Sequence, residues 1–260
     1  ARDAAIRYFD DSTAAVNALR TGDADVVWAM QAPQLLDALP ENITVDIGTT
    51  NGEVLFSMNN NRAPFDDPDV RRAAAYSIDR DAINAVVYNG LATDTGGAPV
   101  PPTDPWFSGK DYYPYDPARA RALMEEAGAV GTPLTLTVPS LPYAQTLSEF
   151  LYSQLTEMGF EVSLETAEFP AVWLSQVMGA KDYQMSLVAH VEPRDIPTIF
   201  GNPDYYLGYD SPQARTLLEQ DDMTGAVARI MEDMPALTLM NMPNIVLYRE
   251  GLTGLQPNQI

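Results

Sequence analysis

A strand–helix–strand unit between residues 134 and 164 most constrains what this chain can fold into. Leu134 to Val138 predicts a strand, and a helix with apolar residues on one face follows and ends at Gly159. Val162 and Leu164 then begin a second strand. A helix of this length between two strands is typical of a right-handed βαβ unit, in which the strands run parallel. The sequence therefore predicts an α/β body with helices packed on a sheet.

Three predicted strands place their carboxyl ends where a ligand site is expected. The third strand is predicted from Tyr183 to Ala189, after a helix predicted from Pro170 to Val177. Ligands of open α/β sheets bind beyond the carboxyl ends of the strands. The candidates for ligand contact are therefore Ser140, Leu141 and Tyr143 after the first strand, Ala167 to Phe169 after the second, and His190 and Glu192 after the third.

The stretch from residue 54 to residue 115 predicts a strand, a capped helix and a long ordered loop. Val54 and Phe56 fall on one face of the strand. Asp66 or Asp67 can cap the helix, and Pro68 sits at a first position where a missing N–H does no harm. Apolar positions recur at helical spacing from residue 70 to residue 87, and an Asn-Gly pair follows as a stop signal. The run GGAPVPPTDP after it predicts a loop.

The order of these pieces resembles one family, the solute-binding proteins of peptide-type ABC importers. This family 5 of extracellular receptors serves dipeptides, oligopeptides, nickel and some sugars. The resemblance rests on a strand that ends in Asn, a Pro-Phe-Asp-Asp-x-x-Val-Arg-x-Ala helix, an Ile-Asp-Arg, a Tyr-x-Gly and a Pro-Val-Pro-Pro loop. In this chain the matching residues are Asn59, Pro64 to Asp67, Val70, Arg71, Ala73, Ile78 to Arg80, Tyr88 to Gly90 and Pro99 to Pro102.

The resemblance implies an α/β fold of the periplasmic-binding-protein-like type II, with a mixed sheet in the second lobe. It implies a partial lobe I at residues 1–52, lobe II at residues 53–236, and a return segment to the hinge and lobe I at residues 237–260. The chain is therefore interpreted as the C-terminal part of a longer receptor. A partial lobe I is expected to leave an apolar surface partly exposed near residues 1–50. In the family a longer helical stretch stands where this chain has only Asp221 to Gly225.

The first fifty residues supply two further candidates. A short strand is predicted from Ile6 to Phe9, then a helix that stops at Gly22, and then a buried strand that ends at Trp28. In the family that last strand belongs to lobe I, and the residues just after it face the cleft. The resemblance therefore implies Trp28 and Gln31 as ligand contacts. For Trp28 the alternative is an ordinary core position at the end of a strand.

Charge and composition exclude two classes of partner. The formal net charge is −21, which argues against nucleic acid, because phosphates must be neutralised by Lys and Arg. No apolar run approaches the about 18–20 residues that a membrane-spanning helix needs, so no membrane span is predicted. The chain has no cysteine, which leaves no disulfide framework and no thiol chemistry.

The sequence offers little that could catalyse a reaction. The only histidine is His190, so a Ser–His–Asp triad would have to use it. There is no Gly-x-Ser-x-Gly, no phosphate-cradling glycine loop and no His-x-x-x-His spacing for a metal. We therefore predict no catalytic residue, no metal site and no cofactor. An α/β hydrolase that acts by acid–base chemistry remains the alternative.

The end of the third strand differs from that of the peptide-binding relatives. In those relatives a Trp-x-x-Asp-type motif ends the strand, and its aspartate pairs with the ammonium group of the peptide. Here Leu187 and His190 stand at the two positions. A neutral imidazole cannot replace a buried carboxylate at comparable strength. Glu192 is the nearby carboxylate that can pair with the ammonium group instead. If it does not, simple dipeptides are expected to bind poorly, and uncharged or anionic solutes are expected to bind better. For His190 the alternative is a hydrogen-bonded residue without a ligand role.

Arg194 lies on the same loop as Glu192. Its planar guanidinium can bind a ligand carboxylate in a bidentate manner. The alternative is a pair with the adjacent Asp195.

Together these observations predict a periplasmic, extracytoplasmic solute receptor of an ABC importer. Two lobes would close around a small ligand, peptide-like or another solute, and the closed form would dock to the permease subunits in the membrane. A ligand-sensing module without transport is equally compatible with the sequence.

Overall fold

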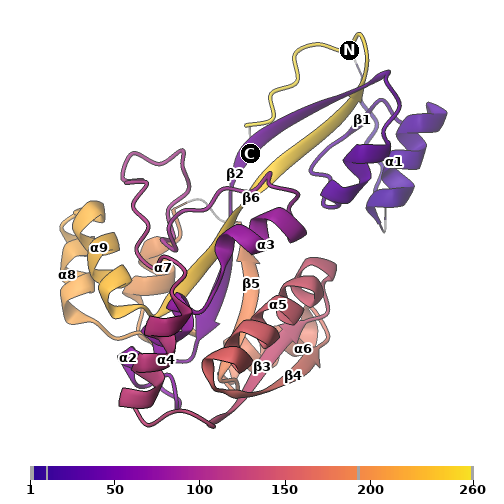
Figure 1. Ribbon diagram of the computed structural model, residues 1–260. Coiled ribbons are helices and arrows are strands. Elements are labelled where there is room, and N and C mark those ends of the chain that lie inside the picture. Colours follow the sequence, from indigo (N-terminus) through magenta and orange to yellow (C-terminus); the bar gives the residue numbers. More distant parts are fainter. Residues whose placement is uncertain (1–2, 10, 192–193, 259–260) are drawn as a thin grey trace.

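The computed structural model describes residues 3–9, 11–191 and 194–258. Within these residues, six strands form one mixed sheet in the order β1-β6-β2-β5-β3-β4. Helices pack on this sheet and at its ends (Figure 1). None of the helices in the described ranges combines the length and the apolar character that a bilayer crossing requires.

Two long antiparallel strands run through the whole molecule. β2 (Ile43–Met58) pairs with β6 (Ala236–Arg249), and the short β1 (Val26–Val27) adds to the other side of β6. The pairing of β2 with β6 is interrupted between Thr49 and Glu53. Figure 1 shows this pair as a ribbon that joins the body with α1 and β1 to the body with the other helices.

The interruption coincides with the boundary between two hydrophobic cores. The smaller core is built from α1 (Ser12–Thr21), β1 and the far ends of β2 and β6. The larger core begins at Val54 on β2 and ends at Met240 on β6. Each strand therefore contributes side chains to both cores, and residues 49–53 lie between them.

The predicted βαβ unit is confirmed. β3 (Pro133–Pro139) and β4 (Glu161–Ala167) run parallel, and α5 (Pro142–Met158) connects them. β5 (Met185–His190) lies parallel to β3 and antiparallel to β2, which makes the sheet mixed, as predicted.

The helices begin and end where short polar residues cap them, with one difference from prediction. Asp67 caps α2 (Pro68–Tyr76) by accepting a hydrogen bond from the backbone N–H of Asp69. The predicted continuous helix to residue 87 is in fact two helices, because Asp79 caps a separate α3 (Arg80–Val87). A side-chain carboxylate at the cap satisfies an N–H that has no partner within the helix.

Two other predicted elements differ in detail. Residues 6–9 form no strand, and their side chains are largely exposed, so the prediction of a strand there is wrong. The helix predicted from Pro170 is α6 (Ala171–Trp173), which continues as one π-helical segment, Leu174–Gly179. The remaining helical elements are a 3₁₀ helix at Pro33–Ala38, α4 (Pro117–Glu126), α7 (Ile196–Gly201), α8 (Pro212–Glu219) and α9 (Met223–Asp233).

The connection after α8 is short, and its central residue, Asp221, has a left-handed backbone conformation with φ 58°. Only Gln220 to Asp222 separate α8 from α9, and Asp222 caps α9 by accepting from the N–H of Gly225. The segment from Gln220 to Asp222, which is shorter than the corresponding segment expected for the family, is therefore a compact turn.

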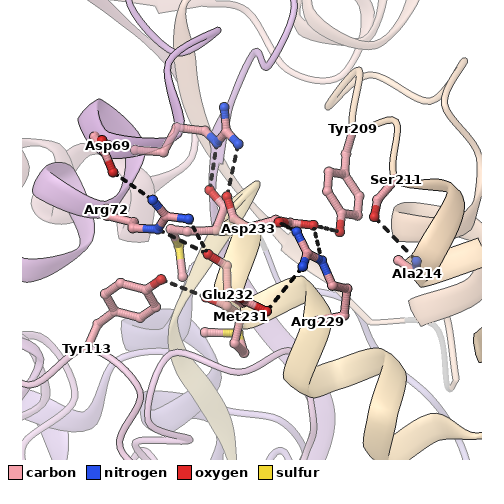
Figure 2. Close-up of polar contacts among 12 residues, drawn as sticks. Asp69, Arg72, Tyr113, Tyr209, Ser211, Ala214, Arg229, Met231, Glu232 and Asp233 are labelled. Carbon is pink, nitrogen blue, oxygen red and sulfur yellow. Dashed lines mark hydrogen bonds and ion pairs between the residues drawn. The ribbon is translucent and has the colours of Figure 1, made fainter. Parts of the chain in front are cut away.

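The carboxyl end of α9 is held by a group of charged and phenolic side chains, here called the helix-end cluster (Figure 2). Arg71 and Arg72 of α2 donate to backbone carbonyls at this end, and the Tyr113 hydroxyl donates to another. Arg229 pairs with Asp233 inside α9. The last carbonyls of a helix have no partner within it, so these donors complete its hydrogen bonding. The acceptors at the helix end are the carbonyl oxygens of Met231, Glu232, Asp233 and Met234.

Candidate functional site

A row of buried polar side chains crosses three strands near the carboxyl end of β5. Glu53 on β2 lies opposite His190 on β5 and opposite Asn241 on β6. Residues that are directly opposite in antiparallel strands point to the same face of the sheet. All three are at least nine-tenths buried. Burial of this much polar surface has a cost, which hydrogen bonds must offset.

Hydrogen bonds link this row to its surroundings. The Nε2 atom of His190 lies 2.9 Å from the hydroxyl of Tyr206, which in turn lies 2.7 Å from Oγ of Ser57. The rings of His190 and Tyr206 are stacked. Thr238 donates from Oγ1 to Glu53 over 3.1 Å, and Nδ1 of His190 lies 4.0 Å from a carboxylate oxygen of Asp195. We call this group the polar seam; it comprises Glu53, Ser57, His190, Asp195, Tyr206, Thr238 and Asn241.

The electrostatics of the polar seam favour protonated acids. The pKa of Glu53 is raised to about 8, chiefly by burial and also by the negative charges of Asp195 and Asp104, while the hydrogen bond from Thr238 opposes the rise. Burial also raises the pKa of the Tyr206 hydroxyl. A carboxyl group in a site of low polarity keeps its proton because the charged form loses its hydration. At neutral pH Glu53 is therefore mostly neutral.

A cavity of about 550 Å³, here called the notch, opens at the interruption between β2 and β6. Its volume lies within the range of about 300–1,000 Å³ that small-molecule sites occupy. The residues that line it are Thr49, Thr50, Asn51, Thr103, Asp104, Arg194 and Asn258.

The notch and the polar seam adjoin each other. Asn51 lies two residues before Glu53, and Arg194 directly precedes Asp195. Asp104 is close enough to Glu53 for its charge to affect the pKa of that carboxyl. Buried groups with shifted pKa beside an open cavity are typical of functional sites.

Two of the predicted residues, Tyr143 and Ser140, form hydrogen bonds at the strand ends. The Tyr143 hydroxyl accepts a hydrogen bond from the N–H of Ala189, the residue before His190, over 2.9 Å. Ser140 accepts from the N–H of Phe169 over 2.9 Å, which ties the end of β3 to the end of β4. Burial raises the pKa of Tyr143, and the bond from Ala189 opposes the rise.

His190 and Arg194, both predicted ligand contacts, differ in their exposure. The imidazole of His190 is buried and hydrogen-bonded inside the polar seam. Arg194 is exposed on the wall of the notch. Glu192 lies outside the described residues. A ligand role for His190, Glu192 and Arg194 stays a prediction.

Trp28 and Gln31 lie on the other body. Trp28 follows β1 and is 45% exposed; its role as a ligand contact and the alternative of a core position both stay predictions. Gln31 is also exposed, and its backbone N–H donates to Ser12 at the start of α1. In Figure 1, β1 and α1 stand apart from β3 and α5, so these two residues are not in the same body as Ser140 and Tyr143. Other exposed apolar side chains near Trp28 in sequence or on β2 are Ile6, Tyr8, Phe9, Val45 and Ile47.

Sequence reasoning missed Glu53, Asp104 and Tyr206. A usable signal existed for Glu53, which is an acidic residue directly before the buried run Val54 to Phe56. No comparable signal marks Asp104 and Tyr206, because each lies in a loop that tertiary contacts bring to the site. Among the described residues, no group of three or more His, Asp or Glu side chains is placed to hold a metal ion.

Comparison with known proteins identifies the family. The model of the bacterial extracellular solute-binding proteins, family 5 (middle region), matches residues 4–197. The chain belongs to this family. Its members are binding proteins and not enzymes, which sets the hydrolase alternative aside.

Relatives within the family are longer than this chain. The glutathione-binding protein GsiB of Salmonella choleraesuis is 34% identical over 161 residues, which cover 61% of this chain and 31% of the relative. GsiB of Pectobacterium atrosepticum is 37% identical over 110 residues, 42% of this chain and 21% of the relative. The matched part thus spans about a third or less of these curated relatives.

Solved structures confirm the fold. The binding protein DppA of Helicobacter pylori, in complex with the peptide STSA, matches with a TM-score of 0.82 at 23% identity, over 97% of this chain and 54% of that one. NikZ of Campylobacter jejuni, in complex with Ni(L-His), matches with a TM-score of 0.78 at 17% identity, over 97% of this chain and 57% of that one. The predicted α/β fold of the type II periplasmic-binding-protein class is confirmed.

Proposed function

We propose that this chain is part of a periplasmic receptor that binds a small solute between two lobes and delivers it to the permease of an ABC importer. The family match over residues 4–197 carries the proposal. We assign the smaller core to a partial lobe I (residues 1–52), the larger core to lobe II (53–236), and residues 237–260 to the return segment.

The interruption between β2 and β6 supports a hinge at the boundary between the cores. Regular pairing stops between Thr49 and Glu53, and the notch opens at the same place. A solute in the notch would touch the segment that joins the two bodies. Its binding energy could then favour one relative orientation of the lobes, provided that it binds that orientation more tightly.

We propose that the ligand contacts come from both lobes. Ser140, Tyr143 and His190 lie at the strand ends of the larger body, and Arg194 follows β5. Glu192, which lies outside the described residues, is proposed from the sequence alone. Trp28 and Gln31 would face them from lobe I. Relatives by sequence or fold are named for glutathione, peptide and nickel complexes, so the proposed ligand is a solute of that size.

Calorimetry on the complete receptor, combined with uptake into vesicles that contain the permease, tests the proposal. Glutathione, an alanine dipeptide and Ni(L-His) are the probes. Permease-dependent uptake of a solute that the receptor binds would support it. Binding without any uptake would indicate a sensing module, and the absence of binding to a wide panel of solutes would overturn the proposal.

A pair of variants tests the role of His190. His190→Ala should weaken solute binding by about 1–3 kcal/mol if the imidazole is a ligand contact. Tyr206→Phe is the matched control, because it removes the same internal hydrogen bond and keeps the imidazole. Equal losses of affinity in the two variants would show that His190 acts only through the polar seam.

A further inference from the structure

Arg194 differs from every other arginine in the described ranges. Its guanidinium makes no hydrogen bond and no ion pair there, although it lies on the wall of the notch. The other described arginines each take part in a hydrogen bond, an ion pair or a contact with an aromatic ring. In a chain with 36 acidic and 15 basic residues, partners for an arginine are plentiful. An arginine that remains without one has its donors available for a ligand.

The carboxylate of Asp104, which lines the same notch, is also available to bind a ligand. Within the described residues, the carboxylate of Asp104 accepts no hydrogen bond and forms no ion pair. The positive charge of Arg194 opposes the rise in the pKa of Asp104 that burial causes, so the two groups are within electrostatic reach. Two opposite charges therefore line one cavity without neutralising each other by contact.

The backbone holds Arg194 in an uncommon conformation. Its φ is 58°, in the left-handed region that non-glycine residues seldom adopt. Such a conformation costs free energy and persists where the surroundings impose it. The next residue, Asp195, belongs to the polar seam near His190. The conformation of the chain here thus sets an exposed guanidinium directly beside a buried polar group.

The remaining lining of the notch is polar and neutral. It consists of the hydroxyl groups of Thr49, Thr50 and Thr103 and the amides of Asn51 and Asn258. No apolar side chain among the described residues lines this cavity. Such a lining suits a hydrated solute rich in hydrogen-bonding groups and gives no advantage to an apolar one.

We propose that the notch binds a solute with one carboxylate and a neighbouring hydrogen-bond donor, with the carboxylate on Arg194 and the donor on Asp104. The inference rests on the proposed function, because it names the solute that this edge of the receptor takes. A guanidinium matches the two oxygens of a carboxylate. Asp104 repels a second negative charge and accepts a hydrogen bond from a hydroxyl or ammonium group.

Four small probes test the proposal on the 260-residue chain. Glycolate carries the carboxylate and a hydroxyl donor, glycine carries an ammonium donor instead, acetate lacks the donor, and glycolamide lacks the charge. The readout is the ¹⁵N–¹H resonance of the Arg194 Nε, assigned with Arg194→Lys. The resonance of Arg121 is the internal control for non-specific anion binding. This arginine is exposed, pairs with Glu125 and donates to the backbone carbonyl of Glu157.

The proposal expects a saturable shift at Arg194 with glycolate and a weaker affinity for acetate, while Arg121 stays nearly unchanged. Glycolamide should bind at least about tenfold more weakly than glycolate, a ratio that corresponds to one charge-assisted hydrogen-bonded contact. If glycine binds more tightly than glycolate, the donor is an ammonium group; the reverse order assigns a hydroxyl. Equal shifts at Arg194 and Arg121, or equal affinity for glycolamide and glycolate, would overturn the proposal.

Two variants separate direct contact from a structural role. Arg194→Gln should abolish the preference for carboxylates over glycolamide, followed through the backbone amides of residues 49–51. Asp104→Asn should raise the affinity for acetate, because the repulsion between two negative charges is removed. The same variant should cancel the higher affinity of glycolate or glycine relative to acetate. A structural disturbance would weaken all four probes alike. If the complete receptor imports a solute but Arg194 responds to none of these probes, the proposed function stands and the notch assignment is wrong.

Discussion

The helix-end cluster and the notch use charged side chains in opposite ways. In the cluster, Arg71 and Arg72 donate to backbone carbonyls. Arg229 pairs with Asp233, as Figure 2 shows. At the notch, Arg194 and Asp104 line the cavity without a hydrogen bond or ion pair within the described residues. The same residue types thus complete a fold in one place and remain available in the other.

The two regions differ in the free energy that is lost when a charged group has no partner in the protein. A buried polar group without a partner destabilises the folded state, so the cluster must be satisfied within the protein. A group at an open cavity is hydrated before a ligand arrives and loses little by having no protein partner. Variants in the cluster should therefore change stability, and variants at the notch should change binding.

Arg71→Ala is expected to have the largest effect, a loss of about 4 kcal/mol in the free energy of unfolding. It removes the guanidinium that donates to the carbonyls of Phe65, Asp233 and Met234, and leaves a buried space. Urea denaturation measures the change. Arg71→Lys should recover only part of it, because one ammonium cannot reach all three acceptors. A loss below about 1 kcal/mol would show that the cluster is not structural.

Glu53→Gln should change the dependence of stability on pH. The ordinary pKa of the carboxyl is 4.5, and its pKa in the folded protein is about 8. Between these values the folded state holds a proton that the unfolded state has released, so stability falls as pH rises, by up to about 1.4 kcal/mol per pH unit. From pH 6 to pH 8 this contribution costs about 2–3 kcal/mol, and it levels off above pH 8, where Glu53 becomes ionised in the folded protein as well.

The glutamine variant should lack this decline, which urea denaturation at several pH values would show. The groups that face Glu53 are Asp195, Asp104, His190, Thr238 and Asn241, and all of them remain in the variant. The exposed Glu149→Gln serves as the matched control and should keep the wild-type profile. If the glutamine variant keeps the profile too, Glu53 is ionised in the folded protein.

Tyr206→Phe should lower the free energy of unfolding by about 1–2 kcal/mol. The change leaves Ser57 and His190 without their common hydroxyl partner. Differential scanning calorimetry against Tyr152→Phe, a substitution at a position that is 43% exposed, measures the effect. Equal melting temperatures for the two variants would mean that water replaces the hydroxyl in the seam.

The smallest effect on stability is expected for Arg194→Ala. Its guanidinium has no hydrogen bond or ion pair in the described part of the chain, so the free energy of unfolding should stay within about 0.5 kcal/mol of the wild-type value. The same urea experiment as for Arg71 gives the comparison directly. A loss comparable to that of Arg71→Ala would remove the distinction between the two regions.

The sequence predicted those features that depend on neighbours along the chain. Asp67 was one of two predicted caps, and the parallel β3–β4 pair follows from the spacing of strands and helix. The positions of Tyr143 and Ser140 at strand ends could be predicted, because the rule for open α/β sheets requires only the order of strands and helices along the chain.

The features that the sequence did not predict depend on register between distant segments. Glu53 reaches the seam because β2 pairs with both β5 and β6, and periodicity within one strand cannot fix that pairing. Tyr206 joins it from a loop. Asp79 divides the predicted helix because a local cap competes with continued helical periodicity.

The position of β6 has a consequence for the order in which the molecule can be assembled on the ribosome. β6 lies between β1 and β2 and supplies side chains to both hydrophobic cores. Residues 59–235 are synthesised between β2 and β6, so β2 must wait for its long partner while most of the chain emerges. Pairing across such a separation is slow because the intervening chain must be closed into a loop. Neither core can be completed during synthesis of the preceding segments, and a polypeptide that stops before residue 236 leaves both of them open.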